Sequence, residues 1–311
     1  MNLKTIWAHL PEWGKAFLPA IGILLTLHLF ILRWVTVRST SMYATLYPGD
    51  LLGVERWPVW TGFNAGDIIV FRDPVQDDRA KSDRQLLVKR IAGMPGDVLE
   101  LRDGELYING QPVAAPPLST SRWTVRLKAG QEAGGVLRAL GLPPGFVLSG
   151  RSLIDLPLNE QLADELRKRP EVAAVSRHGQ EVGSPAHIFP FSPNFKWNND
   201  DYGPVRVPGE GDTVGITPFT LPLYDRIISR YEHNTVEVSG GDLLINGQPA
   251  TRYIIKQDYY FVLGDSRASS SDSRYWGFVP SDQVVGRAGF VLLNARSVRG
   301  QTSKGRSLIA L

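Results

Sequence analysis

Three groups of polar residues in this sequence could supply a nucleophile, a base and a supporting ion pair. Ser41 follows Ser39 in a serine-rich turn, Lys89 lies within an apolar run, and Asp, Ser and Arg alternate over residues 265–274. A serine hydroxyl becomes a useful nucleophile only when a neighbouring base takes its proton. The three groups together therefore suggest covalent catalysis by a serine.

Lys89 is the candidate base. Residues 86–91 are rich in aliphatic side chains and predict a β-strand, in which Lys89 shares a face with Leu87 and Ile91. Burial on that face would lower the pKa of the amine from about 10.4 toward 8, where an amine is an effective base. The alternative is a lysine at a strand edge whose ammonium group reaches water.

Competing catalytic groups are scarce. The sequence has no cysteine, which excludes thiol nucleophiles, disulfides and cysteine-ligated zinc. The five histidines stand outside any Gly-x-Ser-x-Gly elbow or His-Glu-x-x-His zinc motif. If a serine is the nucleophile, Lys89 is the remaining base with an apolar setting, and Ser–Lys pairs are a known variant of this chemistry.

The overall composition limits the class of protein. The 311 residues carry 34 Lys+Arg and 31 Asp+Glu, and the resulting net charge of +3 is too small for a nucleic-acid footprint. Hydrophobic residues make up 43% of the chain, which is enough to build a core and excludes wholesale disorder.

An apolar segment near the N-terminus predicts a transmembrane anchor at about residues 16–37. Residues 16–32 carry no charge. Trp13 and Trp34 would be separated by about 31 Å of helix, which suits two aromatic belts on either side of a hydrocarbon core. A cleaved secretory signal and a buried core helix are the alternatives. Basic residues flank the segment equally, so charge leaves its orientation open.

Beyond the anchor, the sequence predicts a mainly β protein. Asp103-Gly104 and Asn109-Gly110 predict tight hairpin turns, and a near copy of this meander recurs at 240–249. Short segments rich in β-branched or aromatic residues predict further strands at 68–71, 86–91, 98–101, 236–238 and 259–263.

Changes in local composition along the sequence divide the chain into predicted parts. Paired prolines and glycines interrupt the strand pattern in the middle of the chain, and residues 159–169 are expected to form a short helix there. The basic C-terminal stretch is expected to lack regular structure. The predicted parts are an N-terminal segment at 1–38, a discontinuous β core at 39–113 and 226–295, an inserted α+β subdomain at 114–225, and a tail at 296–311.

In their order along the chain, the three polar groups resemble bacterial type I signal peptidases (leader peptidases), a serine protease family with a Ser-Lys dyad. The resemblance covers the anchor and the β core and implies an antiparallel β catalytic core that needs no metal and no cofactor. It is carried by Ser41-Met42 with Thr45-Leu46, by Lys89-Arg90 with Gly93-x-Pro95-Gly96-Asp97, and by Gly264-Asp265-x-Arg267 with Ser270-x-Asp272-Ser273-Arg274-x-Trp276-Gly277.

The resemblance also implies roles for individual residues. Ser41 would be the nucleophile and Lys89 its general base. The backbone N–H of Ser41 and the hydroxyl of Ser39 would stabilise the oxyanion. Ser270 would hold the amine of Lys89 in place, and an ion pair between Asp272 and Arg274 would support the loop.

Four positions depart from the usual pattern of the family. Ala44 stands where proline is common, and Ser266 stands where asparagine is common. Ala268 and Ser269 replace a common Asp-Asn pair. These differences affect the expected shape of the supporting loop and leave the dyad intact.

The function implied by the resemblance is removal of signal peptides from secretory preproteins, with cleavage after small residues. The enzyme would be a single-pass protein of the cell (inner) membrane, with its catalytic domain on the outer or periplasmic face. Its partners would be preproteins and the lipid bilayer, with no nucleic acid, while substrate preference and oligomeric state stay open. The alternatives are a specialised pilus or conjugation processing peptidase, a catalytically silent membrane-tethered scaffold, and a self-cleaving Ser-Lys repressor.

Overall fold

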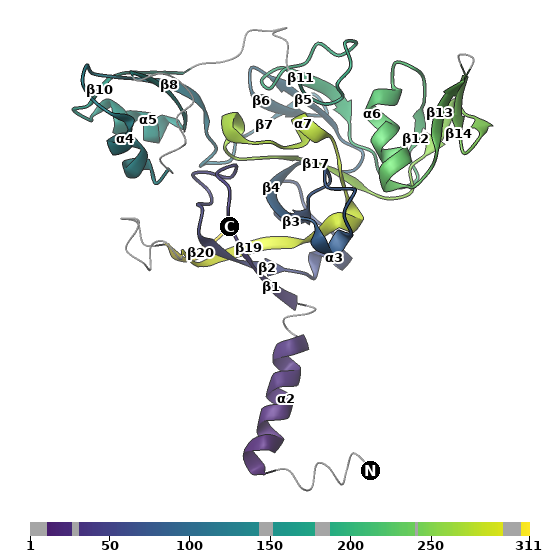
Figure 1. The fold of residues 1–311 in the computed structure, drawn as a ribbon, viewed down its shortest axis with the longest axis horizontal. Helices are drawn as coiled ribbons and strands as arrows, with labels where there is room; N and C mark the ends of the chain where they lie inside the picture. Colours follow the sequence, from purple (N-terminus) through teal and green to yellow (C-terminus); the bar gives the residue numbers. More distant parts are fainter. Residues whose placement is uncertain (1–10, 27–30, 143–151, 178–186, 240–241, 295–305) are drawn as a thin grey trace.

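The fold is mainly antiparallel β, as the sequence predicts (Figure 1). The structure is a computed structural model that describes residues 11–26, 31–142, 152–177, 187–239, 242–294 and 306–311. Its largest sheet has eight strands in the order β1-β2-β19-β3-β4-β17-β18, with β20 paired to β19. These strands are β1 (Leu32–Thr36), β2 (Asp50–Glu55), β3 (Ile68–Arg72), β4 (Leu86–Gly93), β17 (Tyr259–Leu263), β18 (Val279–Pro280), β19 (Val284–Asn294) and β20 (Ser307–Ala310).

The register of this sheet places the candidate base at its centre. Lys89 on β4 lies opposite Ile69 on β3, and the next residue, Arg90, lies opposite Leu263 on β17. Because side chains alternate along a strand, Lys89 and Arg90 point to opposite faces of the sheet. The side chains of these two neighbouring basic residues therefore lie in different environments.

A second sheet forms from the meander that the Asp-Gly and Asn-Gly turns predict. Both turns are formed, with positive φ angles at Asp103, Gly104, Asn109 and Gly110, and the meander is confirmed. A strand from the predicted insertion pairs with the first strand of this meander, so that part of the insertion shares a sheet with the core. The sheet order is β11-β5-β6-β7, with β5 (Val98–Arg102), β6 (Glu105–Ile108), β7 (Gln111–Val113) and β11 (Tyr202–Arg206).

Residues 121–142 and 152–177 of the predicted insertion form a lobe with its own apolar core, at the left of Figure 1. A three-stranded sheet packs against two helices, and the Asn159 side chain caps the second helix by accepting a hydrogen bond from the Leu162 N–H. Tyr43 and Ala44, which follow the candidate nucleophile, are buried in the same core. The elements are β8 (Ser121–Leu127), β9 (Leu153–Leu158), β10 (Val172–Arg177), α4 (Ala133–Leu140) and α5 (Glu160–Arg167).

A third group of elements lies at the opposite side of the molecule (Figure 1). It includes the second copy of the meander as a small three-stranded sheet. The elements are β12 (Thr213–Gly215), β13 (Val236–Ser239), β14 (Asp242–Ile245), β15 (Gln248–Pro249), β16 (Arg252–Ile254), α6 (Leu221–Arg226) and a π-helix at Ile227–Tyr231. Short helices complete the described chain at α3 (Pro58–Thr61), α7 (Ser273–Trp276), Lys81–Asp83, Arg267–Ser269 and Ser281–Gln283.

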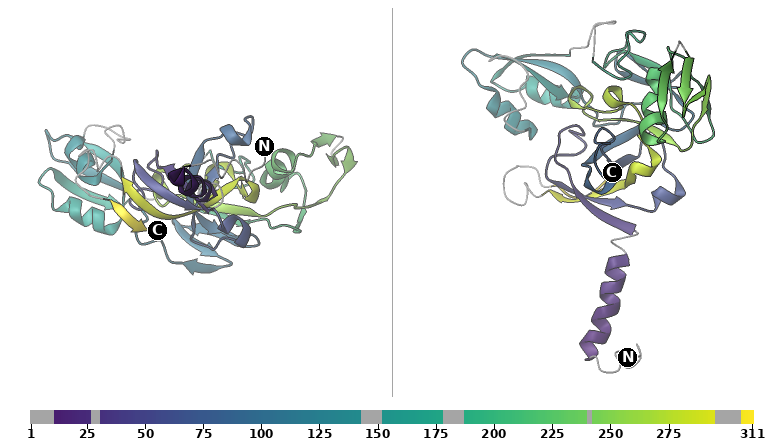
Figure 2. Two further views of the ribbon diagram at one scale, coloured as in Figure 1. Left: turned by 90° about the horizontal axis from the view of Figure 1, so that it is seen from below. Right: turned by 45° about the vertical axis from the view of Figure 1, so that its right-hand side comes forward.

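The N-terminal segment differs from its prediction. Helix α2 (Glu12–Thr26) stands away from the rest of the molecule (Figure 2), but residues 32–36 form strand β1 rather than the end of a helix. The strand is preferred because β2 satisfies its backbone groups, while Val35 and Val37 are buried in the apolar core. The predicted helix boundary at residue 37 is therefore wrong. Among the described helices, none is both long enough and apolar enough to span a bilayer.

The C-terminal stretch also differs from its prediction in the part that the structure describes. Residues 307–310 form β20, which pairs with β19, so the expectation of a tail without regular structure is wrong for them. Arg306 forms an ion pair with the fully buried Asp50, with 3.0 Å between Nη2 and Oδ2. This contact ties the C-terminus to the start of β2.

Candidate active site

The candidate nucleophile lies in a turn between β1 and β2 that buried apolar residues fix on both sides. Tyr43 is buried in the core of the α4–α5 lobe, while Met42 and Leu46 are buried beneath the large sheet. Ala44 has a φ of 60°, which a proline could not adopt because its ring fixes φ near −65°. The departure at Ala44 therefore fits the turn that presents Ser41.

Ser41 and Lys89, which the sequence places 48 positions apart, are in hydrogen-bonding contact in the structure. Lys89 Nζ lies 2.5 Å from Ser41 Oγ, and the side chains are 3% and 6% exposed. Burial lowers the pKa of Lys89 to about 8, although Asp272 opposes that shift by favouring the charged amine. The amine therefore has a substantial neutral fraction near pH 8 and lies within reach of the serine proton.

Potential oxyanion donors surround Ser41. The Ser39 hydroxyl lies 3.2 Å from Ser41 Oγ. The carbonyl of Ser41 accepts a hydrogen bond from the Ser266 N–H at 3.0 Å, which fixes the backbone of the turn. The N–H of Ser41 donates to none of the residues that the structure describes. This arrangement leaves one N–H and one hydroxyl available beside the nucleophile.

An ion pair between Asp272 and Arg274 holds the loop at residues 264–277, which we call the support loop. Two bonds of 2.9 Å join the guanidinium to the carboxylate, and both side chains are at most 1% exposed. Asp272 also accepts from the Gly264 N–H, while Arg274 donates to the carbonyls of Asn199 and Arg267. Burial would raise the pKa of Asp272, but Arg274 and these hydrogen bonds outweigh it and hold that pKa below its usual value.

Ser270 lies in the site but does not make the hydrogen bond to Lys89 that the resemblance implies. Its hydroxyl is buried, helps to lower the pKa of Asp272, and reaches no partner with good hydrogen-bond geometry among the described residues. A side chain at Gly264 would overlap both the Ser270 hydroxyl and the Ser41 carbonyl. The absence of a side chain at Gly264 thus lets the support loop approach the nucleophile.

A second ion pair, between the half-buried Arg90 and the buried Asp265, connects the three polar groups, and the sequence pattern assigned it no role. Arg90 binds both carboxylate oxygens of Asp265, at 2.8 and 2.7 Å. Thr45 donates to the same carboxylate at 2.6 Å. Asp265 thus joins the nucleophile turn, β4 and the support loop. The signal available in the sequence was an Asp at the end of a predicted strand and an Arg beside the candidate base.

Comparisons with known sequences agree on one protein family. A sequence model of the family described as "Signal peptidase, peptidase S26" matches residues 10–147 and 229–293. A signal peptidase I of Bacillus amyloliquefaciens is 32% identical over 153 residues, which cover 48% of this chain and 73% of that protein. A signal peptidase I of Buchnera aphidicola is 24% identical over 312 residues, covering 93% of this chain and 79% of that protein. A crystal structure of a signal peptidase I from Enterococcus faecalis V583 matches 73% of this chain and 96% of its own, with 19% identity and a TM-score of 0.26.

Proposed function

The chain belongs to the signal peptidase family, peptidase S26, and is a serine endopeptidase; from this premise we propose that it removes signal peptides from secreted preproteins by a Ser-Lys dyad mechanism. Ser41 is the nucleophile and Lys89 is the general base. The observation that carries the proposal is the buried contact of 2.5 Å between Lys89 Nζ and Ser41 Oγ. Burial supplies the lowered amine pKa that the role of base requires.

The reaction proceeds in two halves. Neutral Lys89 takes the proton of Ser41 as Oγ attacks the scissile carbonyl, and the protonated amine then gives that proton to the leaving amino group. The signal peptide is left as an ester on Ser41. Lys89 next takes a proton from water as the resulting hydroxide attacks the ester, and the protonated amine returns that proton to Ser41 Oγ as the ester bond breaks. The signal peptide leaves as a carboxylic acid that ionises in water, and both members of the dyad are restored.

The oxyanion of each tetrahedral intermediate is stabilised by the backbone N–H of Ser41 and the hydroxyl of Ser39. The free N–H and the closeness of the two hydroxyls support these roles. One such donor typically contributes a factor of about 10²–10³ in rate. Asp272, Arg274 and Ser270 act on the reaction by positioning the support loop against the turn.

Cleavage after small residues is proposed from the family to which the chain belongs, and the surroundings of Ser41 support a preference for uncharged residues there. The buried side chains of Val37 and Met42 flank the turn, and the half-buried Leu86 and Val88 lead into Lys89 on β4. These residues belong to one apolar cluster. Apolar side chains this close to the nucleophile favour uncharged substrate side chains over charged ones.

We further propose that helix α2 attaches the enzyme to the membrane, with the catalytic domain on the outer face. Helix α2 extends away from the folded body (Figure 1). Packing within the described chain leaves its large apolar side chains exposed. They are Trp13, Phe17, Leu18, Ile23, Leu24 and Leu25.

The experiment that tests this function is cleavage of a preprotein by the purified full chain in detergent, with the cut mapped by N-terminal sequencing of the product. A cut after a small residue at the end of the signal peptide is expected. Ser41→Ala should abolish it, while the matched control Ser82→Ala, at an exposed serine of the short helix Lys81–Asp83, should retain it. Cleavage of a dedicated pilus-type precursor alone would assign the specialised alternative, and cleavage by Ser41→Ala would contradict the dyad.

A further inference from the structure

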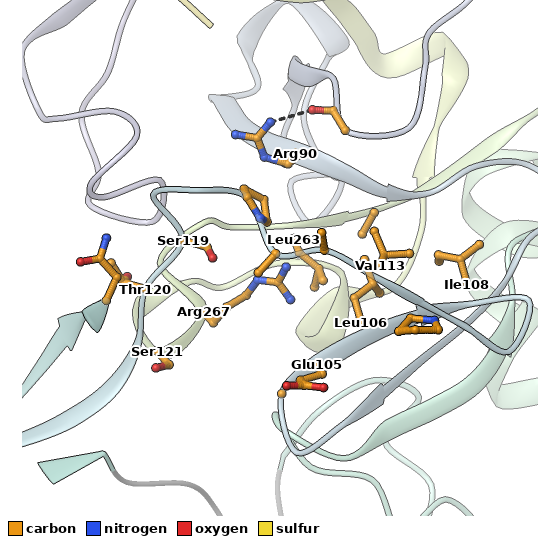
Figure 3. Close-up of a pocket in the computed structure, with 18 of the residues that line it drawn as sticks. Arg90, Glu105, Leu106, Ile108, Val113, Ser119, Thr120, Ser121, Leu263 and Arg267 are labelled. Carbon is orange, nitrogen blue, oxygen red and sulfur yellow. Dashed lines mark hydrogen bonds between the residues drawn. The ribbon is translucent and has the colours of Figure 1, made fainter. Parts of the chain in front are cut away.

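A cavity of about 820 Å³ lies beside the support loop and is separate from the dyad (Figure 3). Its walls come from β4, the β5–β7 meander, the loop that follows the meander and the start of β8. Neither Ser41 nor Lys89 lines it. Its volume is within the range of about 300–1,000 Å³ that small-molecule sites occupy.

The cavity is polar on one side and apolar on the other. In Figure 3, Ser119, Thr120 and Ser121 lie on one side, and Leu106, Ile108 and Val113 lie on the other. The Arg267 side chain rises from the support loop between these two sides. Such a division suits a ligand with one polar end and an apolar body.

Two residues at the polar side have buried hydrogen-bonding atoms that no described residue satisfies. Thr120 is 1% exposed, and its Oγ1 has no partner. Nε and Nη1 of Arg267 are likewise buried and without an acceptor in the described chain. Buried polar groups are almost always paired, so three unpaired atoms on two residues that line one cavity indicate that a ligand there, reached by a rotation of these side chains, supplies an acceptor.

Among the buried charges that the structure describes around the cavity, one cation has no ion-pair partner. Asp265 binds Arg90 through both oxygens, and Asp272 does the same with Arg274. Arg267 forms no ion pair with any described carboxylate, and Arg177, which also lines the cavity, is exposed to water. Burial lowers the pKa of Arg267 to about 10, so the guanidinium is still charged at neutral pH.

The acidic side chains that line the cavity do not neutralise this cation. Asp97, Glu105 and Glu160 contribute to the lining, but none forms an ion pair with Arg267 in the described structure. Asp97 instead accepts from the Met94 N–H and the Asn109 amide. A buried charge without a partner is destabilising, and a bound anion would remove that penalty.

We propose that this cavity binds a carboxylate carried on an apolar body, with the carboxylate held by Arg267 and Thr120. A single uncompensated positive charge matches a monoanion, whereas a phosphate dianion would leave excess negative charge beside Asp265 and Asp272. The apolar body lies along Leu106, Ile108 and Val113. A fatty acid and the free C-terminus of a short apolar peptide both have this chemistry. The site goes beyond the proposed peptidase reaction and does not depend on it.

Calorimetric titration of the full chain in a nonionic detergent tests the proposal with two matched pairs of probes. The first pair is octanoate and octanamide, and the second is the acetylated tetrapeptide Leu-Ala-Leu-Ala with a free or an amidated C-terminus. At least one carboxylate should bind about tenfold or more tightly than its amide, because a charge-assisted bond to Arg267 is lost in the amide. The pair that binds identifies the source of the carboxylate.

Substitutions of single residues test whether the carboxylate binds in this cavity. Arg267→Met should weaken the carboxylate by about tenfold or more, and Thr120→Val should weaken it severalfold without a change in side-chain volume. The matched control is Arg126→Met, at an exposed arginine on β8 outside the cavity lining, which should bind as the wild type does. The proposal is overturned if no carboxylate binds the wild type, if amides bind equally, or if Arg126→Met loses as much affinity as Arg267→Met.

Discussion

Replacement of Lys89 by methionine should stabilise the folded protein at pH 7 while it abolishes cleavage. Methionine has a similar length and no charge, and the Lys89 side chain is only 3% exposed. At pH 7 the amine is protonated in both the folded and the unfolded chain, and only the folded chain bears the desolvation penalty. The fall of the pKa from 10.5 to about 8 corresponds to about 3 kcal/mol. Loss of the hydrogen bond to Ser41 offsets about 1 kcal/mol, which leaves a net gain of about 2 kcal/mol.

The sign of the pH dependence follows from the same pKa. Below pH 8 both states of the wild type bind the proton, so the penalty is complete and constant. Between about 8 and 10.5 the folded amine is neutral while the unfolded amine is still protonated, so the wild type becomes more stable as the pH rises. Lys89→Met lacks this titration. Its advantage should therefore shrink across this window and reverse above pH 10.5, where only the lost hydrogen bond to Ser41 remains and the variant is less stable by about 1 kcal/mol.

Urea unfolding followed by tryptophan fluorescence at several pH values measures both effects. The difference between the two proteins isolates Lys89, because every other group titrates in both. Lys128→Met, at an exposed lysine, is the matched control and should change the unfolding free energy by less than about 0.5 kcal/mol at any pH. The reasoning would be refuted if Lys89→Met were less stable than the wild type at pH 7. It would also be refuted if the difference in unfolding free energy between the two proteins were the same at all pH values.

Four variants test the site. Ser41→Ala and Lys89→Ala should each abolish preprotein cleavage with unchanged far-UV circular dichroism, and appreciable cleavage by Lys89→Ala would end the dyad hypothesis. Lys89→Arg should also be inactive in the same assay, because a guanidinium stays protonated at any working pH; turnover would show that only a positive charge is needed. Asp272→Asn should lower the unfolding free energy by about 3–5 kcal/mol, because Arg274 is left buried without its counter-ion; an unchanged urea midpoint would contradict this.

The strands that the sequence predicts well are those with strong local signals. Residues 259–263 are all buried and form β17, and the turns at Asp103-Gly104 and Asn109-Gly110 close the hairpins as expected. Local preference is enough at such positions, because turn residues and side-chain alternation specify the same structure.

Elements that depend on distant partners were harder to predict. Residues 32–36 continue an apolar run that also suits a helix, and only their pairing with β2 makes them a strand. β20 lies in a polar tail and is held by β19 and by the contact of Arg306 with Asp50. A pattern read along the chain contains no information about such partners.

The candidate site also combines features that the local sequence predicts with features that depend on distant partners. The types and order of Ser41 and Lys89 suggest their chemistry, but their contact depends on the fold. The bonds from Arg90 and Thr45 to Asp265 link residues up to 220 positions apart, which no local spacing reveals. The departure at Ala44 likewise gains meaning only in the structure, where this residue adopts a backbone conformation closed to proline.

The central claim, that a buried neutral amine activates Ser41, is tested most directly by the pH dependence of kcat/KM for preprotein cleavage. Lys89 must lose its proton to act, and its pKa is about 8. The rate should therefore rise about tenfold per pH unit below 8 and level off above it. A profile that is flat through pH 8, or that is half-maximal near the usual histidine pKa of about 6.5, would contradict the claim.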